Sequence, residues 1–135
     1  MRAIWRSGAR FCVGLSLLAA LSAATDDKPT SLSDAQAAIE ANLRTPEGKA
    51  FDDRMGTEFI AKHLGPLHQC KQSAGNDATN FWLLLKLDKD GAVQEVLLYP
   101  STRLGVCARE AYLKDKFLPP PKPAYWVGVY LKLSH

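Results

Sequence analysis

The strongest local pattern of apolar and polar residues lies in two largely apolar segments, 81–89 and 92–99, which the dipeptide Asp90-Gly91 separates. An Asp-Gly pair supplies the positive φ angles of a tight two-residue turn, so the segments are predicted to form a β-hairpin. One face of this hairpin is aliphatic, and we expect it to pack on helices. The turn sets the expected cross-strand pairs, which are Asp88–Val93, Lys86–Glu95, Leu84–Leu97, Trp82–Tyr99, Leu85–Val96 and Leu83–Leu98.

Helical spacing of apolar residues marks the segments on either side of the hairpin. A first helix is predicted to start near Ser31 or Ser33, with Ser33 favoured as its N-cap. A second helix is predicted with Thr45 as its cap and Pro46 in its first turn, and Pro66 should end or kink it. A short helix is expected over 67–72 and a longer one over 104–112. The apolar stripe of the second helix consists of Phe51, Met55, Phe59 and Ile60.

The last regular element is predicted to be a strand, because residues 125–133 alternate with Val127 and Leu131 on one face. Together these elements predict an α+β fold, in which a short antiparallel sheet of the hairpin plus the C-terminal strand packs against helices. Residues 31–135 have the length of a single domain. Residues 25–30 are polar and include Pro29, so we expect a flexible tail there.

The first 24 residues have the layout of a secretory signal peptide. Three arginines precede an apolar run from Phe11 to Ala24, and small residues lie where a signal peptidase would cut. The run is about 14 residues long, shorter than the roughly 20 that a spanning helix needs. We therefore expect cleavage after Ala24, a periplasmic or secreted product, and no membrane insertion after cleavage.

Cleavage would change the charge of the protein. The chain has 17 Lys and Arg residues against 14 Asp and Glu residues, and the predicted signal peptide removes only Arg2, Arg6 and Arg10. The remaining chain would be formally neutral. Because nucleic-acid affinity depends on many phosphate-neutralising cations, we expect no nucleic-acid partner.

Two cysteines, Cys70 and Cys107, remain after the predicted cleavage. An even number of cysteines in an oxidising compartment favours a structural disulfide between them. The chain has no Cys-x-x-Cys motif, which argues against a redox site.

Four aromatic residues, Trp82, Tyr99, Trp126 and Tyr130, are predicted to lie opposite the aliphatic rows of the sheet. If helices cover only one face, these side chains form an exposed patch that suits an interface, because tryptophan and tyrosine are favoured interface anchors. The alternative is that the helices over 31–64 cover them as a second core layer.

Motifs for catalysis or cofactors are not evident. His63, His68 and Cys70 form the only metal-like cluster, but they lack the paired second motif of zinc sites. Turn chemistry explains Asp88-Lys89-Asp90-Gly91 better than a calcium loop does. The prolines over 119–123 favour a rigid corner over a polyproline ligand. No nucleophile elbow and no phosphate-binding glycine loop are present. We expect neither a metal, nor a cofactor, nor an enzyme.

Residues from about 64 to 133 resemble the C-terminal domain of TonB-like periplasmic proteins. The resemblance lies in the order of elements and in three segments: Leu87-Asp88-Lys89-Asp90-Gly91-Ala92-Val93, Pro100-Ser101-Thr102 and Phe117-Leu118-Pro119-Pro120-Pro121. It implies an α+β protein-binding module that engages partners by strand addition at a sheet edge. The chain departs from energy-transducing members, which have a spanning anchor and a long proline-rich spacer.

The function expected from these observations is that of an exported, non-catalytic protein-interaction module with a protein partner in the cell envelope. Its surface is expected to comprise the edge of the last strand and the four aromatic positions. The alternative is a small disulfide-stapled inhibitor of a secreted hydrolase. Such an inhibitor would insert the loop over 73–80 or the proline corner over 119–123 into an active-site cleft.

Overall fold

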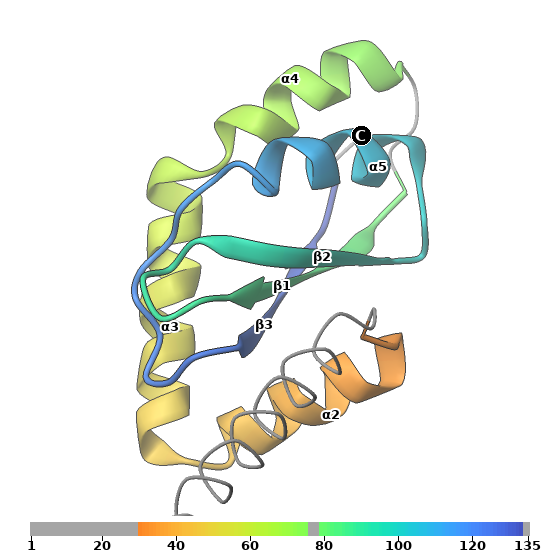
Figure 1. Ribbon diagram of the computed structural model, residues 1–135. Coiled ribbons are helices and arrows are strands. Elements are labelled where there is room, and N and C mark those ends of the chain that lie inside the picture. Colours follow the sequence, from red (N-terminus) through yellow and green to blue (C-terminus); the bar gives the residue numbers. More distant parts are fainter. Residues whose placement is uncertain (1–29, 76–78, 134–135) are drawn as a thin grey trace, which may run out of the picture. The chain divides into compact units, whose positions relative to one another are not determined.

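A computed structural model of the chain describes residues 30–75 and 79–133 (Figure 1). Residues 31–135 form one compact unit, distinct from residues 1–30. The described part contains four helices and a three-stranded antiparallel sheet, which confirms the predicted α+β class. The predicted signal peptide and most of the predicted tail lie outside the described residues. Within the described residues, no helix has the length and apolar character needed to cross a membrane.

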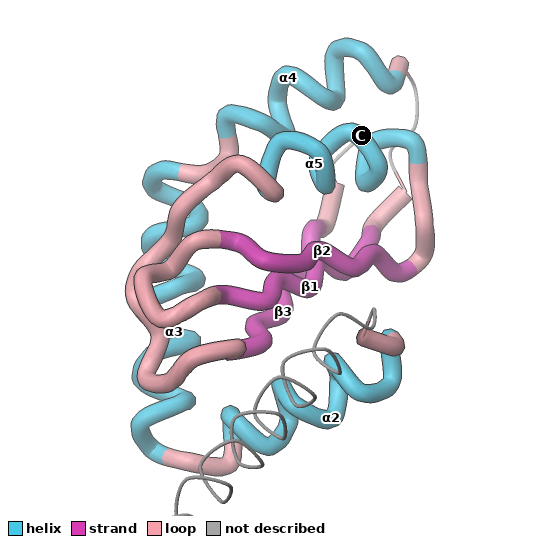
Figure 2. Tube along the Cα trace, viewed as in Figure 1, coloured by secondary structure: helices cyan, strands magenta, loops and turns pink. Residues whose placement is uncertain are grey.

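The sheet has the order β2-β1-β3, with β1 (Phe81–Leu87) between β2 (Val93–Tyr99) and β3 (Tyr125–Leu131) (Figure 2). Both edge strands run antiparallel to β1. The β3 strand ends two residues before the predicted Leu133. Its position at the edge matters for function, because one side of its backbone has no neighbouring strand.

The hairpin differs from the prediction at its turn. Asp88 pairs its backbone with Ala92, and Leu87 instead of Asp88 lies opposite Val93, so the loop has three residues instead of two. In this turn only Gly91 has a positive φ, 89°, as expected for a three-residue loop that ends in a left-handed residue. A register shift after Lys86 then restores the predicted pairs. The other five predicted pairs are confirmed.

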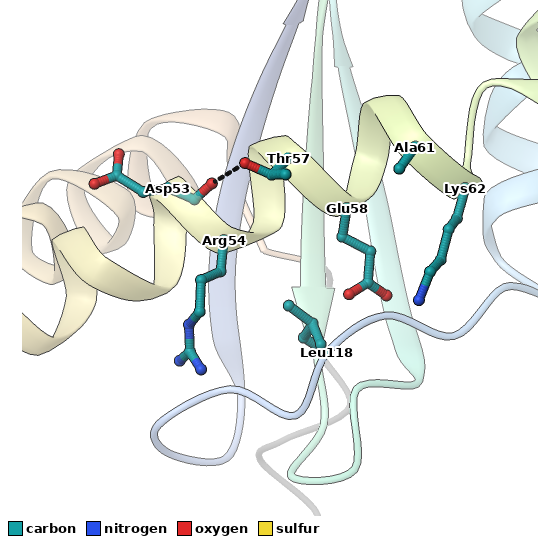
Figure 3. A pocket seen from close by; sticks show the side chains of 7 residues that line it. All are labelled: Asp53, Arg54, Thr57, Glu58, Ala61, Lys62 and Leu118. Carbon is teal, nitrogen blue, oxygen red and sulfur yellow. Dashed lines mark hydrogen bonds between the residues drawn. The ribbon is translucent and has the colours of Figure 1, made fainter.

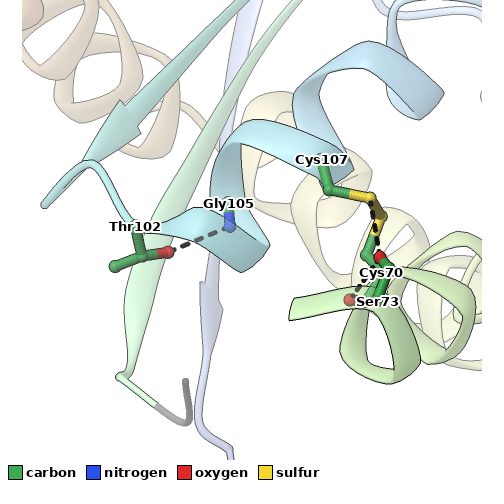
Figure 4. Close-up of a disulfide and its surroundings, with 5 residues drawn as sticks. All are labelled: Cys70, Ser73, Thr102, Gly105 and Cys107. Atoms are coloured by element: carbon green, nitrogen blue, oxygen red, sulfur yellow. Dashed lines mark hydrogen bonds between the residues drawn. A yellow bond between two sulfur atoms is a disulfide. The ribbon is translucent and has the colours of Figure 1, made fainter. Parts of the chain in front are cut away.

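Side chains cap three of the four described helices, α2, α3 and α5. Ser31, not Ser33, caps α2 (Leu32–Leu43), because its hydroxyl oxygen accepts a hydrogen bond from the Asp34 N–H at 3.1 Å. Thr45 caps α3 (Pro46–Lys62) as predicted, and Pro66 lies in the first turn of α4 (Gly65–Ala74). Thr102 caps α5 (Arg103–Tyr112) through the Gly105 N–H at 2.9 Å (Figure 4).

The main core lies between one sheet face and the helices α3, α4 and α5. Side chains at odd-numbered positions of β1 point into it, together with the predicted α3 stripe. Ile60 is an exception to that stripe, since it is 70% exposed. We call this cluster the main core; its buried members are Phe51, Met55, Phe59, Leu67, Cys70, Phe81, Leu83, Leu85, Leu87, Val96, Leu104, Ala108, Tyr112, Phe117, Tyr125, Val127 and Leu131.

The opposite sheet face is covered by a single helix. A second, smaller cluster of Ala35, Leu84 and Trp126 lies between α2 and the sheet, and we call it the α2 layer. Figure 1 shows α2 on the side of the sheet away from α4 and α5. The sheet is therefore covered on both faces, but unequally.

A disulfide joins α4 to α5, as predicted from the cysteine count. The bond links Cys70 and Cys107, with an S–S distance of 1.97 Å and a Cα–Cα distance of 5.7 Å (Figure 4). Its two Cα atoms are spaced as in ordinary protein disulfides. The bond fastens together the two helices that cover the same end of the main core.

Candidate binding surface

Three of the four predicted aromatic positions form one exposed row across the sheet. Trp82 on the central strand pairs with Tyr99 on one side and with Tyr130 on the other. Their exposed fractions are 43%, 54% and 50%, respectively. The rings of Trp82 and Tyr130 lie 5.1 Å apart, within the range of favourable aromatic pairs. We call Tyr99, Trp82 and Tyr130 the aromatic row.

The fourth aromatic position does not belong to this surface. Trp126 is only 5% exposed and packs in the α2 layer against Ala35 and Leu84. Its prediction as an exposed interface residue is therefore wrong. The reason is that α2 ends over the Trp126 end of the sheet, where the Asn42 side chain contacts the backbone of this strand. The alternative prediction, that N-terminal helices cover all four rings, holds for Trp126 alone.

The outer edge of β3 is partly closed by a side chain from α2. The buried Asn42 donates a hydrogen bond from Nδ2 to the Trp126 carbonyl oxygen at 3.1 Å. This carbonyl therefore points away from β1. Because backbone groups of alternate residues in a strand point to the same side, Gly128 and Tyr130 also direct their N–H and C=O groups outward. Within the described residues, these outward groups of Gly128 and Tyr130 have no hydrogen-bond partner.

Gly128 lies under side chains of α2 and of the central strand. A Cβ atom at this position would lie 3.3 Å from both the Ile39 and Leu84 side chains and 3.6 Å from the Trp82 ring. The absence of a side chain lets Ile39 and Trp82 pack over the strand.

A pocket of about 200 Å³ lies between α4 and the end of β3. Five leucines and three basic side chains line it, and no acidic residue does. Three consecutive residues, 131–133, contribute to its wall, as expected for a pocket that reaches the edge of a strand. We call it the leucine pocket; its lining residues are Leu64, Leu67, His68, Lys71, Leu104, Leu131, Lys132 and Leu133.

A second concave region lies on α3, beside the connector that leads to β3. It is an open groove of about 500 Å³ (Figure 3). Arg54, Glu58 and Lys62, spaced four residues apart, extend from one helix face toward Leu118. The cations flank the carboxylate, as on many solvated helix faces.

Behind Glu58, the buried His63 connects α3 to the segment after α5. Its Nδ1 lies 2.8 Å from an Asp115 carboxylate oxygen, and its ring packs on Phe117 with centroids 4.2 Å apart. Its Nε2 is buried without a hydrogen bond, 3.6 Å from Glu58 Oε1. The Tyr112 hydroxyl donates to the His63 carbonyl oxygen, and burial together with the Asp115 charge raises the pKa of Tyr112. This cluster fastens the connector to the helices.

The predicted absence of a metal site concerned His63, His68 and Cys70, and the structure separates these residues. His63 is buried beside Asp115, His68 lines the leucine pocket, and Cys70 is in the disulfide. Within the described residues, no group of three or more histidine, cysteine or acidic side chains is arranged to hold a metal ion.

The loops proposed for the inhibitor alternative are described only in part. Residues 76–78 of the loop over 73–80 lie outside the described residues. The proline corner is described. Leu118, just before it, lines the α3 groove, and Lys116 forms an isolated bridge with Ala92 at the hairpin.

Comparisons of the chain with protein-family models, with curated proteins and with solved structures find no match.

Two features of this surface were not predicted from the sequence, the contact of Asn42 with β3 and the leucine pocket. Asn42 continues the α2 stripe of Leu32, Ala35 and Ile39 at helical spacing, so a polar residue on an apolar face was the available signal. The leucine pocket gave no such signal, because its walls come from α4, α5 and β3, which are distant in sequence.

Proposed function

We propose that this protein is an exported, non-catalytic interaction module that binds an extended segment of a partner protein along the outer edge of β3. The observation that carries this proposal is the juxtaposition of the aromatic row with the unpaired backbone groups of Gly128 and Tyr130. An added strand gains affinity from main-chain hydrogen bonds and specificity from contacts of its alternate side chains.

The composition of the exposed row supports a protein partner. Tyrosine and tryptophan bury large areas at a small cost in conformational entropy, and they dominate the energetics of many interfaces. Three such rings in one cross-strand row expose more apolar surface than a solvated sheet face requires.

The disulfide supports the proposed compartment. Disulfides persist in oxidising environments and are rare in reducing ones, and the 1–24 segment has the layout of a signal peptide. We therefore place the protein in the periplasm or outside the cell, with its partner in the cell envelope. The resemblance of residues 64–133 to TonB C-terminal domains agrees with a strand-adding module, although α2 lies outside the resembling region.

The experiment that tests the proposal compares two substitutions at one position. Tyr130→Pro removes the outward N–H of β3 together with the ring, whereas Tyr130→Thr removes the ring and keeps the N–H. Because the Tyr130 N–H points away from β1, proline is tolerated there as on other edge strands. A photo-reactive amino acid at Lys132, an exposed position directly after β3, reports the partner by cross-linking in cells.

If the proposal is right, the cross-link to a specific partner weakens in Tyr130→Thr and disappears in Tyr130→Pro, while both variants keep the wild-type circular dichroism spectrum. Equal cross-linking by both folded variants and the wild type would contradict a binding surface at this edge.

A further inference from the structure

We infer that the partner segment is an acidic, apolar peptide strand that places one aliphatic or phenyl side chain in the leucine pocket and the adjacent side chain on the aromatic row. This inference rests on the proposed function and specifies the partner of the same edge. It assigns a binding role to the leucine pocket, to His68 and Lys132, and to Asn42.

The position of the added strand along β3 follows from the hydrogen bond that Asn42 makes. The carbonyl of Trp126 is already bonded to Asn42 Nδ2, so an added strand finds no free acceptor at that residue. Pairing is confined to Gly128, Tyr130 and the residues that follow them. The partner strand therefore lies at the end of β3 that carries Tyr130, and Asn42 marks where pairing stops.

The alternation of side chains then sets what each partner residue meets. A residue opposite Tyr130 has its side chain on the same face as Tyr130 and lies beside the Tyr130 ring, whose other side packs against Trp82. The next residue, opposite Leu131, points to the other face, where Leu131 and Leu133 line the leucine pocket. Two neighbouring residues of the partner thus reach two different apolar sites.

The volume of the leucine pocket limits the size of the partner side chain that enters it, which we call the anchor. Its volume is about 200 Å³, and a cavity of about 150 Å³ with aliphatic walls holds one benzene molecule. A leucine, methionine or phenylalanine side chain therefore fits. The floor of the pocket is already buried, since Leu67, Leu104 and Leu131 are each less than a tenth exposed.

The charge of the pocket selects an acidic neighbour for that anchor. The lining includes His68, Lys71 and Lys132 but no carboxylate. Within the described residues, neither His68 nor Lys132 forms an ion pair. A glutamate or aspartate beside the anchor would lie near these donors, so complementarity favours an acidic segment over a basic one.

The experiment starts from a random octapeptide library displayed on phage and selected on the purified full-length protein. The most enriched peptide is then titrated into isotope-labelled protein and followed by NMR at backbone amides and leucine methyl groups. We expect saturable shifts at the amides of Gly128 and Tyr130 and at the methyl groups of Leu64 and Leu133. We also expect the enriched peptides to share an acidic residue and an aliphatic or phenyl residue next to an aromatic one.

Substitutions in the peptide and in the protein sharpen the test. Replacing the anchor of the peptide by alanine should weaken binding about tenfold or more, since an apolar side chain then leaves the pocket. Lys132→Glu should weaken binding several-fold, and about 0.5 M salt should reduce this difference. Lys122→Glu is the matched control, because this exposed lysine does not line the pocket.

The outcomes separate this inference from the proposed function. If the peptide shifts the Gly128 and Tyr130 amides but its anchor can be replaced without loss, the inference is overturned and the strand-adding module stands. If no selected peptide shifts those amides, both fail. Leucine methyl shifts without edge amide shifts would overturn the strand alignment, as would enrichment of basic peptides.

Discussion

The two faces of the sheet are covered very differently. Three helices and a disulfide enclose the main core, where Leu83, Leu85 and Leu87 are completely buried. On the other face a single helix covers Leu84 and Trp126 and leaves the aromatic row half exposed. The main-core face therefore contains most of the buried apolar packing of the fold, while the incomplete covering of the other face leaves three aromatic side chains exposed.

The largest expected loss of stability comes from alanine substitutions at two neighbouring leucines of β1, whose side chains point to opposite faces of the sheet. Leu85→Ala in the main core should cost about 4 kcal/mol, because packed helices on that face leave the cavity unfilled. Leu84→Ala in the α2 layer should cost about 2 kcal/mol, because a single helix can settle toward the sheet. Urea denaturation of both variants measures the difference. An equal loss in the two variants would mean that the faces are equally rigid.

The second largest effect is expected from removing the disulfide, which joins two helices that cover the main-core face of the sheet. Replacing Cys70 and Cys107 by serine together should lower the free energy of unfolding by about 3 kcal/mol, given their separation of 37 residues. Wild-type protein in reductant should unfold at the same urea concentration as the double variant. If the NMR shifts of the Trp82 and Tyr130 rings are unchanged in that folded variant, the two faces act independently; changed ring shifts would show that the faces are coupled.

The α2 layer is held by a hydrogen bond that a third variant removes. Asn42→Ala leaves the buried Trp126 carbonyl without its partner and should cost about 1–2 kcal/mol. Gln36→Ala, at an exposed position of the same helix, should stay within about 0.5 kcal/mol of the wild type. Thermal unfolding measures both changes. A neutral Asn42→Ala variant would indicate that packing alone holds α2.

The smallest effect concerns a carboxyl group at the margin of the main core. Burial and the neighbouring Asp53 raise the pKa of Asp52 above its ordinary value. A raised pKa in the folded state means that Asp52 contributes stability below its unfolded pKa of about 4, and that this contribution is lost as pH rises through the folded pKa. Asp52→Asn should therefore stabilise the protein at neutral pH.

Melting temperatures at two pH values measure this effect. The gain at pH near 7 should be a few tenths of a kcal/mol, since Asp52 is only partly buried, and it should vanish near pH 3. Asp53→Asn should give a smaller gain of the same sign, because it removes only the second cause. A gain that persists at acid pH would have another origin than the charge of Asp52.

Much of the fold followed from local sequence patterns. The Thr45 cap, the helix break near Pro66, the hairpin pairs from Trp82 to Lys86 and the Cys70–Cys107 bond all agree with the structure. The errors lie where a local pattern allows two outcomes. The Asp90-Gly91 dipeptide is compatible with two-residue and three-residue loops, and the bond between Phe117 N–H and the Gly91 carbonyl joins this turn to a distant segment.

The candidate site was predictable only in part for the same reason. The alternation of the strands placed Trp82, Tyr99 and Tyr130 on one face correctly, and it placed Trp126 there as well. The alternation along the strands contained no information on which end of that face the helix α2 would cover. The leucine pocket could not be predicted, because its walls meet only when α4 packs beside the end of β3.

The sequence by itself determined which strand residues share a face, where α3 begins and which cysteines pair, because these properties depend on short-range periodicity, capping and parity. The tertiary structure alone decided that Trp126 is core while Trp82 and Tyr130 are surface, that Asn42 closes one end of the β3 edge, and that five leucines enclose a pocket at the other end. Burial is a property of what packs against a residue, and for this sheet the covering helix α2 precedes the strand β3 by more than 80 residues.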